Sequence, residues 1–183
     1  PQIAANFLDC DYLFLAADTV QVRLLFNAII HQYLIPGAQV GAKALVKEST
    51  GELLEVYSVS RPVTPDTGCL WCNELISPSK LQEETQIPTE RRAQRYLNEP
   101  EIVAPSVITL NAQAAAQAAN DFLFSVTGLT LSEANNDYAL FRARQRTFQF
   151  IQPRADADCL ECGTHSKSRR GRGDKGRLPT KNK

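Results

Sequence analysis

Two C-x-x-C pairs, far apart in the chain, constrain the fold more than any other feature of this sequence. Cys69 and Cys72 form the first cysteine pair, and Cys159 and Cys162 form the second, with 86 residues between the pairs. Four thiolates suit a tetrahedral zinc ion of the closed, structural kind. In a compact zinc ribbon the second pair follows within roughly 15–20 residues. Here a shared ion would instead tie the C-terminal part of the chain to the middle of a larger fold.

Other uses of the cysteines fit the pattern less well. A secreted disulfide protein is an alternative, but the chain has an odd number of cysteines and no visible secretory signal. A thioredoxin-like redox pair is a second alternative, but neither pair opens a helix directly after an obvious strand. The fifth cysteine, Cys10, precedes an apolar run and is expected to be a buried thiol.

Size and composition predict one ordinary soluble domain. The chain has 183 residues, of which 43% are hydrophobic and 22% charged. No apolar run is long enough to span a membrane, so we expect no membrane partner and a cytoplasmic location. The chain lacks methionine and opens on Pro1, which predicts a fragment without its true N-terminus.

The charge is divided unevenly along the chain. Residues 163–183 contain eight Lys or Arg and one acid, which leaves a net charge of −7 on residues 1–162. The basic segment has no apolar periodicity, so we expect a disordered tail after a domain that spans residues 1–162. The tail could contact nucleic acid, but the pattern favours a solvated segment, and nucleic acid is not an expected partner.

Hydrophobic periodicity in the first third predicts a strand, a helix and a hairpin. The expected strand at residues 12–17 is apolar throughout, as in strands buried on both faces. A helix follows at residues 18–33, and residues 38–46 and 53–59 read as an antiparallel hairpin around a short turn.

The rest of the chain predicts a long loop, a long helix and a second hairpin. Residues 73–99 are mostly polar and read as a loop. Residues 105–127 form an Ala- and Gln-rich helix that Gly128 ends. Residues 138–141 and 147–151 read as a late hairpin. This order predicts α/β architecture. The apolar stripe of the long helix is expected to be Val107, Leu110, Ala114, Ala118, Phe122 and Val126.

Asp18 is the leading candidate ligand-binding residue, because it lies where the first strand passes into a helix. Ligands in open α/β sheets bind outside the carboxyl ends of strands, and a carboxylate there can hold Mg²⁺ beside nucleotide phosphates. The alternative is an N-cap, since Asp18 and Gln21 resemble a capping box. Arg23 lies one turn further and could reach a phosphate or form a surface ion pair. The chain has no P-loop and no G-x-G-x-x-G motif that follows an expected strand and opens a helix.

Together these motifs resemble the ubiquitin-activating-enzyme superfamily, in its ThiF/MoeB/HesA branch. Residues 18–23 followed by Asn27 resemble the family's D-x-x-x-x-R-x-x-x-N helix, and the two distant cysteine pairs match its zinc ligands. Residues 35–37 with Gly41 resemble its next strand, and residues 104–107 with the following Ala-rich helix resemble its crossover helix. The similarity covers roughly residues 7–163.

The resemblance implies the C-terminal part of a Rossmann-like ThiF/MoeB-type fold with a mixed sheet. It implies ATP- and Mg²⁺-dependent adenylation of the C-terminal glycine of a ubiquitin-like or sulfur-carrier protein. Asp18 would be catalytic and would bind Mg·ATP, Arg23 would contact the cofactor, and residues 73–99 would guide the partner's tail. Family members commonly form homodimers, so we expect one here.

The family's glycine-rich loop and its triphosphate-binding Arg and Lys would lie upstream of Pro1. We therefore expect these 183 residues alone to be inactive. The segment between the cysteine pairs contains no thiol, so we expect the reaction to stop at the acyl-adenylate or to pass to a separate thiol. An inactive scaffold, or a zinc-stabilised binding module whose basic tail contacts nucleic acid, remain as alternatives.

Overall fold

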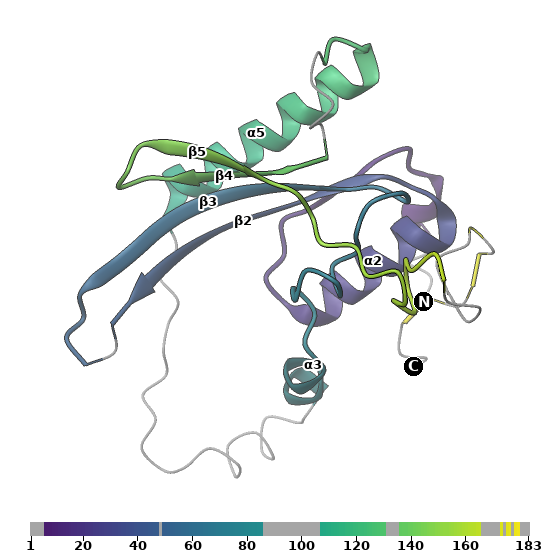
Figure 1. Ribbon diagram of the computed structural model, residues 1–183, viewed down its shortest axis with the longest axis horizontal. Helices are drawn as coiled ribbons and strands as arrows, with labels where there is room; N and C mark the ends of the chain where they lie inside the picture. The colour runs from purple at the N-terminus through teal and green to yellow at the C-terminus, as the bar shows by residue number, and fades with distance from the viewer. Residues whose placement is uncertain are drawn as a thin grey trace.

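A mixed five-stranded sheet in the order β1-β2-β3-β4-β5 forms the centre of the protein (Figure 1). The computed structural model describes residues 6–47, 49–85, 107–130, 136–165, 173, 175–176 and 178–179. β1 runs parallel to β2, and each later neighbour is antiparallel. The α/β architecture expected from the sequence is therefore confirmed. The strands are β1 Leu13–Leu15, β2 Gly37–Val46, β3 Leu53–Val63, β4 Tyr138–Arg142 and β5 Thr147–Ile151.

Helices pack on both faces of this sheet. Ser58 and Ser60 of β3 face helix α5, whereas Val63 of the same strand packs against helix α2. Residues of opposite parity on a strand point to opposite faces, so α2 and α5 lie on opposite sides of the sheet. The helical segments are the 3₁₀ helix η1 Asn6–Asp9 and the α-helices α2 Val20–Tyr33, α3 Pro78–Thr85 and α5 Ile108–Thr127.

The main core lies between α2, the β1 side of the sheet and the loop that carries the first cysteine pair. Its buried members are Leu15, Val20, Phe26, Ile30, Val63, Leu70 and Ile76. Gly37 allows β1 and β2 to approach there, because a Cβ at Gly37 would overlap the carbonyl oxygen of Leu13 and lie 2.9 Å from the Phe26 ring. A smaller cluster joins β3 to β4.

Small side chains allow α5 to pack closely on β2 and β3. Leu110, Ala114 and Ala118 are buried, as the sequence pattern predicted. The two ends of the predicted stripe are wrong, since Val107 is 37% and Val126 62% exposed. The C-terminal end of α5 rises away from the sheet, which explains the exposure of Val126 (Figure 1).

The structure corrects two expectations about the first strand and its helix. β1 is not buried on both faces, because Phe14 is 52% exposed and β1 is the edge strand of the described sheet. α2 begins at Val20, with Thr19 at its N-cap, so the predicted Asp18 cap is wrong. Cys10 is exposed and not buried.

Two predicted segments fall partly outside the described residues. Residues 73–99 are not a continuous loop, because α3 occupies Pro78–Thr85, while residues 86–99 are not described. The long helix begins later than expected, at Ile108, because Val107 is its N-cap and has extended backbone angles; Pro105 and Ser106 lie outside the described residues. None of the described helices has the length and apolar character needed to cross a bilayer.

Candidate functional site

The four cysteines of the two pairs converge as the sequence predicted. Their sulfur atoms all lie within 4.8 Å of one another, and none forms a disulfide. Sγ–Sγ distances are 3.7 Å for Cys69–Cys72, 3.7 Å for Cys69–Cys159 and 3.6 Å for Cys72–Cys162. A tetrahedron with Zn–S bonds of 2.3 Å has S–S edges of about 3.8 Å. The arrangement therefore fits a closed metal site.

Asn73 joins the two segments that carry the cysteines. Its Nδ2 donates to the carbonyl oxygens of Cys69 (2.9 Å) and Arg154 (3.1 Å), and its Oδ1 accepts the N–H of Arg154 (2.9 Å). A Cβ at Gly68 would overlap the carbonyl oxygen of Arg154, so only glycine fits at this crossing. The metal site is thus framed by direct contacts between the segments.

Hydrogen bonding and burial give the clustered cysteines unequal pKa values. The bond between Cys69 and Cys162 raises the pKa of Cys69 and lowers the pKa of Cys162 to about 5. Burial raises the pKa of Cys72 to about 11. A metal ion binds these sulfurs as thiolates, so its binding must displace thiol protons from the cluster.

α2 holds the loop of the first cysteine pair through two polar side chains. The Oδ1 of Asn27, which is fully buried, accepts the N–H of Leu70 at 2.8 Å. The Nη1 of Arg23 donates to the carbonyl oxygen of Leu75 at 3.2 Å. Residues four apart share a helix face, so both can reach the same loop. Arg23, predicted to bind a cofactor, thus also supports the metal loop.

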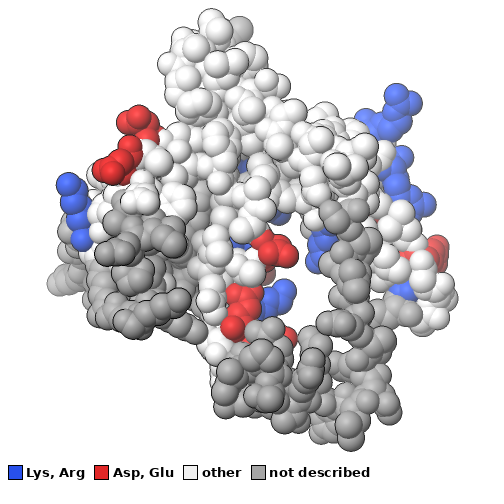
Figure 2. Space-filling view, turned by 180° about the vertical axis from the view of Figure 1, so that it is seen from behind, with Lys and Arg blue, Asp and Glu red and all other residues white. Residues whose placement is uncertain are grey.

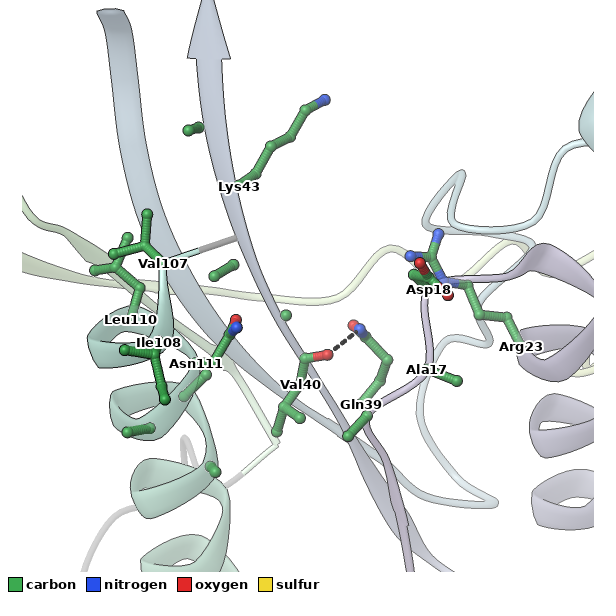
Figure 3. A pocket seen from close by; sticks show the side chains of 17 residues that line it. Ala17, Asp18, Arg23, Gln39, Val40, Lys43, Val107, Ile108, Leu110 and Asn111 are labelled. Atoms are coloured by element: carbon green, nitrogen blue, oxygen red, sulfur yellow. Dashed lines mark hydrogen bonds between the residues drawn. The ribbon is translucent and has the colours of Figure 1, made fainter. Parts of the chain in front are cut away.

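A cavity of about 760 Å³ lies between the carboxyl end of β1, strand β2 and the first turns of α5 (Figure 3). Asp18 and Arg23 line one side and Lys43 of β2 another. In Figure 2, acidic and basic side chains lie close together near the middle of the face. The structure therefore brings the two predicted site residues to one cavity, at the edge where ligands bind in α/β sheets.

The carboxylate of Asp18 is available at the rim of this cavity. Asp18 is exposed and makes no hydrogen bond or ion pair with the described residues. The expected capping box with Gln21 is absent, because Glu84 of α3 caps the helix instead. Its Oε1 accepts the N–H of Val20 at 2.8 Å and its Oε2 that of Gln21 at 2.9 Å.

Sequence reasoning missed a polar pair behind the cavity, formed by the buried Gln39 and the half-buried Arg61. Arg61 Nη1 donates to Gln39 Oε1 at 2.6 Å, and Gln39 Nε2 donates to the carbonyl oxygen of Val40 at 2.6 Å (Figure 3). Burial lowers the pKa of Arg61, whose guanidinium lies 5.7 Å from the centre of the Tyr138 ring. No carboxylate of the described residues pairs with it. The available signal was Gln39, a polar residue within a strand of mostly small and apolar residues.

Comparisons with known proteins locate this fold among solved structures. No protein-family model matches the sequence, and a search of curated proteins found no match. A structure of *E. coli* MccB with ATP matches 87% of this chain and 42% of its own, at 16% identity and a TM-score of 0.53. The chain shares its fold with MccB. It spans about two fifths of the length of that structure.

Two further MccB structures give the same result. *E. coli* MccB with MccA-N7isoAsn matches 84% of this chain and 41% of its own, at 15% identity and a TM-score of 0.54. The microcin C7 biosynthetic enzyme MccB with N-formylated MccA matches 87% and 44%, at 16% identity and a TM-score of 0.54. At these identities the similarity establishes the fold.

Proposed function

We propose that the protein takes part in ATP-dependent adenylation of the C-terminal glycine of a ubiquitin-like or sulfur-carrier protein, as ThiF/MoeB-type enzymes do. The observation that carries this proposal is Asp18, whose carboxylate has no partner among the described residues and lies on the rim of the cavity. The fold supports the proposal, because MccB with the same fold has been solved with ATP.

The residues around the cavity suit a ligand that carries phosphates. Asp18 would hold Mg²⁺ through its carboxylate, and the ion would offset phosphate charge. Arg23 and Lys43 line the cavity and would attract the remaining negative charge. Arg61, a half-buried cation without a carboxylate partner among the described residues, adds positive potential behind Gln39. In the reaction the substrate carboxylate attacks the α-phosphorus, and pyrophosphate leaves.

The metal centre would act as a structural support for this site. Four thiolates close the coordination of a zinc ion, which leaves no position for substrate. Because Arg23 and Asn27 bind the loop of the first cysteine pair, that loop and α2 support one another. Zinc would therefore stabilise the helix that follows Asp18.

Isotope exchange between pyrophosphate and ATP tests the proposed reaction. Asp18→Asn in the complete gene product should abolish exchange that depends on the carrier substrate. Asp11→Asn is a matched control, because Asp11 is also exposed but precedes the amino end of β1. Exchange at the wild-type rate in Asp18→Asn would reject the proposal. We expect residues 1–183 alone to be inactive, since they contain no P-loop and their G-x-G-x-x-G string, at residues 171–176, lies in the basic tail and not after a predicted strand.

The proposed partners are a C-terminal peptide tail and a second copy of the chain. MccB has been solved with MccA, which supports a peptide-like substrate. The described surface of α5 carries large exposed apolar side chains, with Ile108 at 81% and Val126 at 62% exposure, which supports a homodimer. Sedimentation analysis should give a dimer, and a monomer at micromolar concentration would reject this partner. The cytoplasmic location stays a prediction.

The described tail residues do not favour the nucleic-acid-binding alternative. The N–H groups of Gly173 and Lys175 donate to the carbonyl oxygens of His31 (3.3 Å) and Gln32 (3.0 Å) at the end of α2. At these two residues the backbone of the tail is therefore bound to α2 of the same chain. Most of residues 163–183 lie outside the described part, so the predicted disorder of the tail stays a prediction.

A further inference from the structure

Glu84 performs the capping task that the sequence pattern assigned to Asp18. We infer that Glu84 is a positioning residue: by capping α2 it leaves the carboxylate of Asp18 free to face the cavity. The inference rests on the proposed function for the role of Asp18 in binding Mg·ATP. It assigns to α3, a helix 8 residues long, a part in assembling the site.

The geometry shows which group satisfies the start of α2. Thr19, at the N-cap, has extended backbone angles and makes no side-chain capping bond. Both carboxylate oxygens of Glu84 bind amides of the first turn, at 2.8 Å to Val20 and 2.9 Å to Gln21. Leu81, one turn earlier in α3, packs against the main core. Glu84 is therefore presented from a helix that the core anchors.

Without Glu84, the same amides would attract Asp18. Asp is among the preferred N-cap residues, and the N-terminus of a helix carries a partial positive charge. Asp18 lies only two residues before Val20. A carboxylate that caps the helix would turn toward the backbone and away from the cavity. Glu84 prevents this competition because it already occupies both amides.

The cap also restricts how an anion can bind. Many phosphate sites use the free N–H groups at a helix N-terminus. Here Glu84 fills that place with a negative charge of its own. A phosphate in the cavity must therefore use a cation at Asp18, together with the side chains of Arg23 and Lys43. The arrangement selects a metal-bound phosphate over a free one.

Amide signals test the cap independently of any activity. In the zinc-loaded chain, Glu84→Ala should speed hydrogen exchange at Val20 and Gln21, and a further Asp18→Asn change should then alter their amide shifts. Glu84→Gln keeps one acceptor oxygen and should give an intermediate effect. It replaces Glu84→Ala as the test variant if Glu84→Ala does not fold. Glu52→Gln, which removes an equal charge from the β2–β3 turn, should change neither amide. Unchanged Val20 and Gln21 signals in both Glu84 variants would overturn the inference.

A double-mutant cycle on Mg·ATP binding by the complete gene product tests the link to Asp18. Glu84→Ala should weaken binding between about 10- and 100-fold, because it lets the key carboxylate move. In an Asp18→Asn background the same change should have little effect, since the residue it positions is gone. Equal effects in both backgrounds would overturn the inference. If the wild-type protein binds no Mg·ATP, the proposed function fails, and the amide measurement alone decides whether Glu84 keeps Asp18 free.

Discussion

At the scale of single residues, the polar side chains near the site mainly bind backbone groups of distant segments. Asn27 binds Leu70, Asn73 joins both cysteine segments, and Glu84 caps α2. The spacing of Asp18, Arg23 and Asn27 was visible in the sequence, and the position of Arg23 and Asn27 on one face of α2 follows from it. Their partners were not visible, because each partner lies on another segment.

Asn27 should contribute clearly to stability. Its replacement by Ala leaves the N–H of Leu70 buried without its acceptor. We expect a loss of about 1–3 kcal/mol in the free energy of unfolding. Urea unfolding measures the change, and Asn120→Ala on the exposed face of α5 is the matched control. Equal effects of the two substitutions would contradict this assignment.

Tyr12 should make the protein less stable at alkaline pH. Burial, and next the nearby Asp121, raise the pKa of Tyr12 from 10.0 to about 12. The folded state therefore favours the protonated phenol, and this stabilisation is complete below pH 10 and is lost as the pH rises through about 12. Between pH 10 and 12, the melting temperature of Tyr12→Phe should therefore fall less than that of the wild-type protein. If the melting temperatures of the two proteins fall equally with rising pH, this prediction is wrong.

At the scale of elements, periodicity predicted the helices and hairpins well and their exposure less well. The hairpins at β2–β3 and β4–β5 and the end of α5 at Gly128 are confirmed. The helix α3 was missed, because its sequence is polar and short. β1 was expected to be buried because its residues are apolar, but an edge position exposes Phe14. Periodicity reports which residues share a face and not what covers that face.

The contact between α5 and the sheet should tolerate only small residues. Ala118 is fully buried, so Ala118→Leu must push the helix from β2 and β3. We expect this overpacking to cost about 1–3 kcal/mol of the free energy of unfolding. Ala119→Leu changes the neighbouring exposed position by the same volume and should change stability little. A similar loss in both variants, measured in urea, would show that the contact is not close-packed.

At the scale of the whole molecule, the two cysteine pairs link the segment after β5 to the segment after β3. Asn73 and Gly68 already bring these segments together, so a bound metal ion would reinforce a contact that the chain makes by itself. The pairing of the cysteines could be predicted because residue type and spacing suggest zinc directly. The contacts around it could not, since they depend on how the sheet orders its strands.

Metal removal should weaken the fold as a whole. We expect about one zinc per chain by elemental analysis and a loss of several kcal/mol of stability on chelation or in Cys162→Ser. Because binding displaces thiol protons, metal affinity should fall as the pH is lowered. Cys10→Ser is the matched control, since Cys10 is exposed and lies outside the cluster. A chain that melts at the same temperature with and without metal would rule out this role.

Local pattern alone determined the α/β class, the main helices and hairpins, the four clustered cysteines and the position of Asp18 after a strand. These features follow from short-range spacing and from the chemistry of single residue types. Only the tertiary structure decided that Glu84 caps α2, that Arg23 and Asn27 support the metal loop, and that Arg61 lies behind Gln39. Each of these contacts joins residues that are far apart in the chain, and the free energy of such a contact exists only once folding has brought them together.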